Sequence, residues 1–353
     1  MTDELYMQRC LELAMMGMGS VSPNPMVGCV IVKDGQIIGE GYHAKFGEAH
    51  AEVNAIKSVI ARYGDEAAAL LAEATAYVSL EPCAHFGKTP PCADLLIQHR
   101  LKKVVIGNLD PFEGVNGKGI EKLKNAGITV VSGMLAQQCT ALNRRFFTRI
   151  YQQRPYIILK WATSANGYFA PEKPAQQWIS GPAAKKLVHK WRTEEDAILV
   201  GRLTATLDNP ALTAREWPGK NPIRIMIDSQ LKTPSDHHIY NKEAKTIVFN
   251  EQKTAVQDNI HFIEMEDMQY YLPQKIAYQL YLMDVQSVII EGGANILGQF
   301  IQAGLWDEAR VFRSGQSWET GIPAPELNPQ KSTITDQFTV EKDQLTIYKN
   351  NPL

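Results

Sequence analysis

Apolar residues in the first part of the chain occur either in short runs or at helical spacing. The short runs are bounded by Gly, Asn, Asp and Pro, which is typical of strands between turns. We expect these strands over residues 27–32, 36–42, 74–80, 103–107 and 129–132. The helical spacing predicts helices over residues 5–16, 48–60, 92–99 and 120–125. Strands that alternate with helices indicate a layered α/β domain, which we place at residues 1–145.

The same two patterns return in the second part of the chain. Strands are expected over residues 156–161, 197–201, 223–229, 246–250 and 288–290. Helices are expected over residues 180–193, 276–283 and 296–303. A chain of 353 residues exceeds one ordinary hydrophobic core, so we assign residues 146–353 to a second α/β domain.

A basic and aromatic stretch, residues 142–154, lies between the two predicted domains. Its arginines surround Phe146, Phe147 and Ile150, a composition that RNA-binding segments also use. Because the stretch is short and the whole chain is close to neutral, an amphipathic connector is the favoured interpretation.

Composition narrows the class of protein further. Hydrophobic residues make up 44% of the chain and charged residues 21%, as in a globular protein. The formal net charge of −2 argues against nucleic acid as a partner, and no apolar run is long enough to span a membrane. The acidic start, Met1 to Glu4, lacks the basic region of a signal peptide, and five cysteines suit a reducing compartment. We therefore expect a cytoplasmic protein.

One His and two Cys form the strongest chemical signal in the chain. His50, Cys83 and Cys92 offer three zinc ligands, which leave the fourth tetrahedral position open, as in catalytic zinc sites. Glu52 lies two residues after His50 and is available to move protons, which is the arrangement of zinc deaminases. The positive end of the helix at residues 48–60 would favour an ionised Glu52. A structural zinc site with His85 as the fourth ligand is the alternative.

Polar residues in the second half also mark candidate chemistry. Lys160 interrupts an apolar strand, where a charge is costly without a partner or a role. Residues 208–215 form a polar loop with a carboxylate and a guanidinium. Glu291-Gly292-Gly293 stands between a strand and a helix, where glycines either let the backbone approach phosphates or form a tight packing turn.

Motifs along most of the chain now permit a comparison with a known family. The two Cys are separated by eight residues, whereas most cytosine- and adenine-type deaminases have two between them. This long spacing and residues 22–30 and 50–52 resemble the bifunctional riboflavin-biosynthesis deaminase/reductase family. The second half resembles it at residues 154–156, 159–160, 177–179, 208–213, 227–229 and 291–293. The resemblance extends over residues 1–310.

The resemblance implies a cytidine-deaminase-like three-layer domain followed by a dihydrofolate-reductase-like domain. It implies one zinc ion per chain and two consecutive reactions on a phosphorylated pyrimidine. The first is hydrolytic deamination of 2,5-diamino-6-ribosylamino-4(3H)-pyrimidinone 5′-phosphate, with Glu52 as the proton carrier. The second is reduction of the ribosyl chain to a ribityl chain with NADPH. We also expect a homo-oligomer, either a dimer or a tetramer.

The resemblance also implies roles for individual residues. The deaminase pocket is expected to be lined by Asn24, His43, His85, Lys88 and Asp110, with Lys88 suited to a phosphate. The catalytic positions of the reductase match Lys160 and Asp208. Its cofactor contacts match Ala162, Trp178, Thr204, Asp208, Ser229, Gly293, Ala294, Asn295, Ile296, Leu297, Gly298 and Gln299. Its substrate contacts match Gln176, Arg192, Leu212, Arg215 and Glu291, where the guanidinium groups suit a phosphate.

One segment departs from the family pattern. After Glu308 the family continues with an apolar strand and a loop containing Pro and Lys, whereas residues 309–318 here include two arginines and several polar residues. This departure leaves a second hypothesis, in which a deaminase carries a weakened reductase half that binds a ligand or a partner. An RNA-base deaminase is a third, which the long Cys spacing and the absence of a basic surface disfavour.

Overall fold

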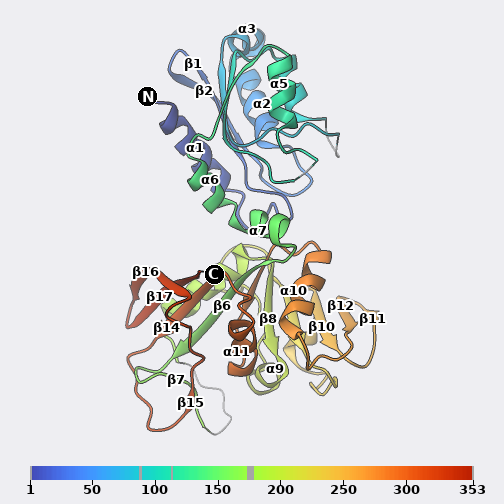
Figure 1. Ribbon diagram of the computed structural model, residues 1–353, viewed down its shortest axis with the longest axis vertical. Coiled ribbons are helices and arrows are strands. Elements are labelled where there is room, and N and C mark those ends of the chain that lie inside the picture. Colours follow the sequence, from blue (N-terminus) through green and yellow to red (C-terminus); the bar gives the residue numbers. More distant parts are fainter. Residues whose placement is uncertain (1, 87–89, 113, 173–178, 352–353) are drawn as a thin grey trace. The chain divides into compact units, whose positions relative to one another are not determined.

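The computed structural model of the protein describes residues 2–86, 90–112, 114–172 and 179–351 (Figure 1). The chain divides into two compact units between Gln153 and Arg154. Within the described residues, no helix combines the length and the apolar character needed to cross a membrane.

The first unit is built on a five-stranded sheet in the order β2-β1-β3-β4-β5. β1 is antiparallel to both β2 and β3, and the remaining pairs are parallel. The strands are β1 (Gly28–Lys33), β2 (Gln36–Tyr42), β3 (Thr75–Leu80), β4 (Lys103–Asn108) and β5 (Thr129–Ser132). The helices are α1 (Asp3–Met15), α2 (Ala51–Tyr63), α3 (Ala67–Ala72), α4 (Cys92–Gln98), α5 (Lys118–Asn125), α6 (Ala136–Leu142) and α7 (Arg144–Gln152), with a 3-10 turn η1 (Gly64–Glu66).

Helices cover both faces of this sheet, which explains why β1 is almost continuously apolar. Cys29 and Ile31 pack in the core beneath α2, α3, α4 and α5. Val30 and Val32 pack on the opposite side against α1 and α6. Successive residues of a strand point to opposite faces, so one strand contributes to both cores. The predicted three-layer α/β architecture is confirmed (Figure 1).

The arginine-rich stretch, interpreted from the sequence as an amphipathic connector, contains a helix. It includes α7, whose Phe146 and Phe147 are buried against Leu80 of the first unit. Its apolar face therefore belongs to the first core, and the structural division falls after this helix instead of at the expected 145/146.

The second unit contains a ten-stranded sheet in the order β11-β12-β10-β9-β8-β13-β6-β14-β17-β16. The strands from β12 to β14 in this order are parallel, and β11, β17 and β16 are antiparallel to their neighbours. The strands are β6 (Tyr156–Thr163), β8 (Ala197–Gly201), β9 (Ile223–Ile227), β10 (Thr246–Asn250), β11 (Ala255–Gln257), β12 (Ile260–Glu264), β13 (Ser287–Ile290), β14 (Glu308–Arg313), β16 (Ser332–Val340) and β17 (Asp343–Asn350). A separate two-stranded sheet joins β7 (Tyr168–Ala170) to β15 (Ile322–Pro323).

Helices pack on both faces of the large sheet as well. Its helices are α8 (Pro182–Glu194), α9 (Arg202–Asp208), α10 (Leu272–Leu282) and α11 (Ala294–Gln302), with a 3-10 turn η2 (His238–Tyr240). In β6, Ile157 and Leu159 face α10 and α11, whereas Ile158 faces α8. Asp208, expected in a polar loop, is instead the last residue of α9.

The segment that departs from the family pattern forms β14, between β6 and β17. Ala309 and Phe312 are buried in the cores on either face. Arg310 is also buried, but it pairs with Glu308 at 2.6 Å and with Glu195 at 3.5 Å. Because these ion pairs compensate the buried charge, a strand that looks too polar in the sequence lies inside the sheet.

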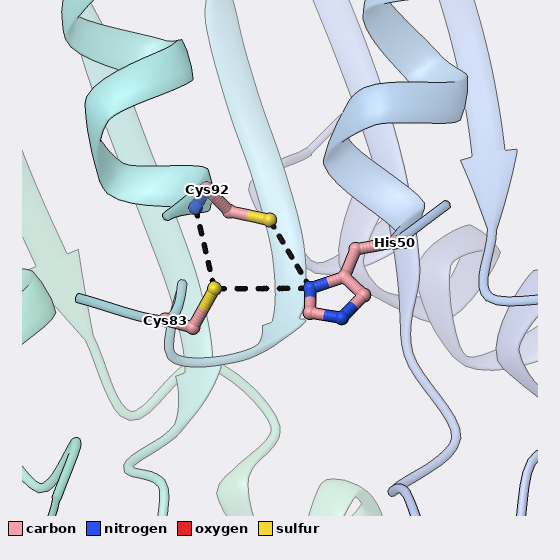
Figure 2. Close-up of side chains that lie close together, drawn as sticks. All are labelled: His50, Cys83 and Cys92. Carbon is pink, nitrogen blue, oxygen red and sulfur yellow. Dashed lines mark hydrogen bonds between the residues drawn. The ribbon is translucent and has the colours of Figure 1, made fainter. Parts of the chain in front are cut away.

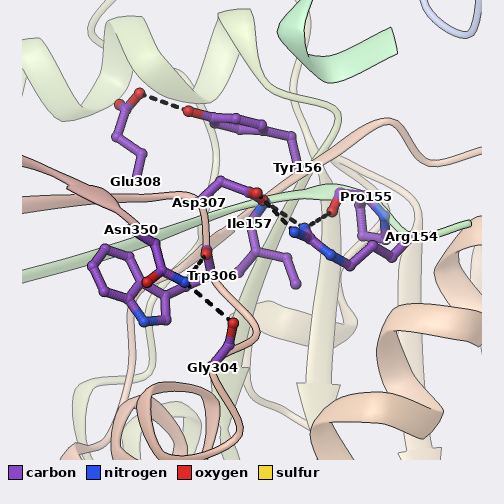
Figure 3. A network of polar contacts seen from close by, with 9 residues as sticks. All are labelled: Arg154, Pro155, Tyr156, Ile157, Gly304, Trp306, Asp307, Glu308 and Asn350. Carbon is purple, nitrogen blue, oxygen red and sulfur yellow. Dashed lines mark hydrogen bonds and ion pairs between the residues drawn. The ribbon is translucent and has the colours of Figure 1, made fainter. Parts of the chain in front are cut away.

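The beginning and end of the second unit are joined by polar contacts (Figure 3). Arg154 binds both carboxylate oxygens of Asp307, at 2.6 and 2.8 Å. Asp307 also accepts the Ile157 N–H at 2.8 Å, and the Asn350 side chain donates to the carbonyls of Gly304 and Trp306. These contacts fix β6 and β17 to the turn before β14.

Candidate active sites

The three proposed zinc ligands are carried by the ends of three elements. His50 immediately precedes α2, Cys83 follows β3, and Cys92 is the first residue of α4. α2 rests directly on β2, since a Cβ on Gly41 would lie 2.3 Å from the Ala55 nitrogen. This close packing sets the position of His50 relative to the sheet.

His50, Cys83 and Cys92 converge on one point (Figure 2). The His50 Nδ1 atom lies 3.3 Å from Cys92 Sγ and 3.7 Å from Cys83 Sγ, and all three ligand atoms are within 4.8 Å of one another. A tetrahedral zinc ion with bonds of about 2.1 Å to N and 2.3 Å to S separates such atoms by about 3.6 Å. The donor set and its spacing therefore fit zinc. His85 is exposed and lies outside this group, with its ring 6.2 Å from that of Phe112, so the structural four-ligand alternative finds no support.

The environment of Cys83 favours its thiolate form. Hydrogen bonds from Cys92 and His50 lower the pKa of the Cys83 thiol, and the Cys92 backbone N–H donates to its sulfur at 3.2 Å. A thiolate is the form that binds zinc.

Glu52 lies in the first turn of α2 and is only 3% exposed. Burial raises its pKa to about 7, and the Cys83 charge adds to this effect. Burial therefore opposes the ionised form that the helix end was expected to favour. A carboxyl group with a pKa near neutrality suits a residue that must both accept and return a proton.

A cavity of about 340 Å³ opens beside the three ligands. Asn24 donates toward the His43 ring at 3.1 Å, and the other ring nitrogen of His43 lies 3.1 Å from the Ala49 carbonyl. The cavity brings together the sequence-predicted residues Asn24, His43, His50, Glu52, Cys83, His85 and Asp110. Lys88 lies outside the described residues.

The cavity also has walls that the sequence analysis missed. They include Phe46, Phe112, Phe146 and Glu81. The proximity of Glu81 to Cys83 was the one available signal for it. The aromatic residues have no motif or spacing that would have identified them as cavity walls, because they come from distant parts of the chain: Phe46 and Phe112 lie outside helices and strands, and Phe146 lies in α7.

In the second unit, a cluster of charged side chains surrounds Lys160. Arg192 donates to Glu291 at 2.8 Å and to the Thr213 carbonyl at 3.1 Å. Burial lowers the pKa of Lys160, and the nearby Glu291 charge opposes this effect. Burial would raise the pKa of Glu291, but the charges of Arg192 and Lys160 together lower it. The structure thus brings together Lys160, Arg192 and Glu291, which are far apart in the sequence.

Four of the proposed cofactor residues, Ala162, Thr204, Ser229 and Gly293, lie at or shortly after the carboxyl ends of the neighbouring strands β6, β8, β9 and β13. Ligands of open α/β sheets commonly bind at this edge. Thr204 of α9 lies against the glycine turn before α11, since a Cβ on Gly292 would be 2.9 Å from Thr204 Oγ1. Ser229 follows β9, and Ala162 lies near the end of β6.

Other assigned residues fall in different surroundings. Leu212 is 2% exposed and packs in a core with residues of β8, β9 and β10, so only its backbone can face a ligand. Arg215 is exposed. Gln176 and Trp178 lie outside the described residues.

Fold and site together define a zinc-dependent deaminase unit followed by a reductase-type unit. Residues 1–108 match the family "Cytidine and deoxycytidylate deaminase zinc-binding region", and residues 155–314 match the "RibD C-terminal domain" family. The chain belongs to the RibD family, and it is a bifunctional deaminase and reductase of riboflavin biosynthesis that uses zinc and NADPH.

Full-length relatives carry this assignment. The chain is 38% identical to riboflavin biosynthesis protein RibD of Aquifex aeolicus (strain VF5), over 97% of this chain and 95% of the relative. It is also 38% identical to the Escherichia coli (strain K12) RibD, over 88% of this chain and 87% of the relative.

Solved structures agree over nearly the whole chain. The diaminohydroxyphosphoribosylaminopyrimidine deaminase/5-amino-6-(5-phosphoribosylamino)uracil reductase of Thermotoga maritima superimposes with a TM-score of 0.88 at 34% identity, covering 98% of both chains. Acinetobacter baumannii RibD gives a TM-score of 0.87 at 32% identity, covering 99% of both chains. This coverage includes the atypical segment after Glu308, which favours the bifunctional enzyme over the hypothesis of a weakened reductase half.

Proposed function

We propose that the first unit hydrolyses the amino group of 2,5-diamino-6-ribosylamino-4(3H)-pyrimidinone 5′-phosphate, and that the second unit reduces the ribosyl chain of the product with NADPH. The observation that carries this proposal is the three-ligand group of His50, Cys83 and Cys92, which adjoins a cavity containing Glu52. The substrates named for the Thermotoga maritima relative support the choice of pyrimidine.

In the deaminase, each residue has a distinct task. Zinc held by His50, Cys83 and Cys92 would activate a water molecule as a Lewis acid. Glu52 takes one proton from the attacking water and delivers it to the ring nitrogen; it then takes the remaining proton of the added hydroxyl and passes it to the amino group, which leaves as ammonia. Asn24 and His43 are held by their mutual hydrogen bond and orient the pyrimidine, together with Asp110.

In the reductase, NADPH supplies the hydride, and the protein positions the sugar and manages its protons. Lys160 has a lowered pKa and is therefore a readier proton donor to the sugar oxygen when the ribose ring opens. Asp208, whose pKa is raised by burial, is a second group able to hold a proton there. Arg192 is held by Glu291, and Arg215 adds an exposed guanidinium that suits the phosphate.

The proposal also includes the compartment and the oligomeric state of the protein. We propose a cytoplasmic homo-oligomer, a dimer or a tetramer. None of the five cysteines forms a disulfide, which suits a reducing compartment. Light scattering coupled to size-exclusion chromatography measures the oligomeric state, and a monomeric mass would contradict that part of the proposal.

Two variants assayed on both half-reactions test the residue roles. Glu52→Gln keeps the size of the side chain but removes the proton carrier, so deamination should fall by about 10²-fold or more while zinc content stays at one per chain. Reduction of supplied deaminated intermediate by NADPH should continue. Asp208→Asn should lower NADPH-dependent reduction while deamination continues, so the deaminated intermediate should accumulate.

Zinc analysis and NADPH oxidation are measured on the same preparations. Loss of zinc from a folded Glu52→Gln protein would mean that Glu52 is a ligand or a structural support. If this variant also fails to reduce supplied intermediate, the two activities are not separable by site.

A further inference from the structure

Glu81 is a buried carboxylate that the zinc group does not include. It follows β3 directly, two residues before Cys83, and is 4% exposed. Its backbone N–H continues the strand ladder by donating to the Asn108 carbonyl at 2.9 Å. Glu81 is among the residues that line the cavity.

Each carboxylate oxygen of Glu81 accepts hydrogen bonds from two backbone N–H groups. Oε2 accepts from Asp110 at 3.3 Å and from Gly117 at 2.9 Å. Oε1 accepts from Gly119 at 2.9 Å and from Ile120 at 3.2 Å. Hydrogen bonds to a charged acceptor are stronger than neutral ones, and three of these donors lie at the beginning of α5, where negative charge is favoured.

The glycines of this contact allow the backbone to approach closely. A Cβ on Gly119 would lie 2.1 Å from the Pro82 carbonyl oxygen and 3.1 Å from Glu81 Oε1. Gly117 has a φ of +81°, a conformation that other residues rarely adopt. The chain is therefore shaped to surround this one carboxylate.

The segment between the anchored amides forms one wall of the cavity. Asp110, Phe112 and Val115 line it. Asp110 Oδ1 accepts the Phe112 N–H at 2.9 Å, which fixes its side chain relative to the loop backbone. Glu81 holds the segment at Asp110 and again at Gly117, so the direction of the Asp110 carboxyl depends on Glu81.

We infer that Glu81 is a positioning residue for deamination, which acts by holding Asp110, Phe112 and Val115 against the pyrimidine. This inference rests on the proposed substrate contact of Asp110. The zinc group uses other side chains, so Glu81 affects how the substrate is bound and leaves zinc binding unchanged.

The test is Glu81→Gln in the full, zinc-loaded chain, assayed on the diaminopyrimidine substrate. An amide keeps one acceptor oxygen and turns a donor toward the other two N–H groups, so the wall should move. We expect KM for deamination to rise about tenfold with kcat within about threefold, because binding is lost without loss of the proton carrier. Zinc should remain at one per chain.

A matched control separates positioning from general destabilisation. Asp228 in the second unit is 1% exposed and accepts the Lys232 and Thr233 N–H groups at 3.0 and 2.8 Å. Asp228→Asn makes the same chemical change, and we expect it to leave KM for deamination unchanged. If Glu81→Gln does not fold, Glu81→Asp keeps the charge and withdraws it by one methylene, and the same rise in KM is expected.

Asp110→Ala and the double variant distinguish the two proposals. If Asp110→Ala leaves KM unchanged, the proposed substrate contact fails. If Asp110→Ala raises KM but the Glu81 variants do not, the inference about Glu81 is wrong. A double variant with KM equal to that of Asp110→Ala alone supports action through Asp110, whereas a further multiplicative rise overturns it.

Discussion

His189 shows how a single buried side chain makes stability depend on pH. It lies in α8, is 1% exposed, and has Nε2 3.8 Å from Glu216 Oε1. Burial, followed by the charges of Arg192 and Arg215, lowers its pKa to about 4. The folded protein therefore keeps this imidazole neutral where an unfolded chain would protonate it.

The sign of the effect follows from the two pKa values. An unfolded His titrates near 6.5, so between about pH 6.5 and 4 the unfolded state binds a proton that the folded state does not. His189 should thus lower the free energy of unfolding by about 1–3 kcal/mol as pH falls through this window, with no effect above it. The free energy of unfolding, measured with urea at pH 7.5 and 5.0, should differ less between the two pH values for His189→Gln than for the natural protein. Equal differences for the variant and the natural protein would contradict this assignment.

At the scale of elements, the contact between α2 and β2 determines where the zinc group sits. Gly39 and Gly41 of β2 face α2 with no space for a Cβ, which would lie 2.4 Å from Val59 and 2.3 Å from the Ala55 nitrogen respectively. α2 carries Glu52 and begins next to His50. A small displacement of this helix therefore moves a ligand and the proton carrier together.

Gly41→Ala should push α2 away from the sheet. We expect a loss of about 1–3 kcal/mol in stability from overpacking and weaker zinc binding in competition with a chromophoric chelator. Gly298→Ala in α11 is the control, since a Cβ there meets no atom within 4 Å apart from its chain neighbours and its own helix backbone, and it should retain stability and zinc affinity. Unchanged zinc binding by a folded Gly41→Ala protein would show that the contact does not set the ligand geometry.

At the scale of the whole molecule, each unit has hydrophobic clusters of its own. The zinc unit is built around the residues beneath α2 and α1, and the reductase unit around β6, β8 and β13. Asp307 belongs to the second unit alone, where it accepts Arg154 through both oxygens and the Ile157 N–H. Both side chains of this ion pair are mostly buried.

Asp307→Asn should therefore destabilise the second unit selectively. Removing one charge from a mostly buried pair costs about 2–4 kcal/mol. NADPH-dependent reduction should be lost at a lower urea concentration than in the natural protein, while kcat and KM for deamination stay the same. Parallel loss of both activities would show that the units unfold together.

The sequence by itself determined the elements that depend on local pattern. The continuous apolar strand at β1 and the turn-bounded strands β5, β8 and β10 have the expected bounds to within a residue. The spacing of His50, Glu52, Cys83 and Cys92 indicated the zinc chemistry, because few arrangements of these residue types serve another purpose. Periodicity and ligand chemistry are properties of nearby residues, which the sequence records directly.

Only the tertiary structure decided what depends on distant partners. β14 looked too polar until Glu195 and Glu308 paired with Arg310. Glu52 was expected to be ionised, but burial raises its pKa to about 7. Glu81 and the amides of Asp110, Gly117, Gly119 and Ile120 come from separate stretches of the chain. Desolvation and long-range hydrogen bonds arise from neighbours that folding brings together, so no local pattern could have revealed them.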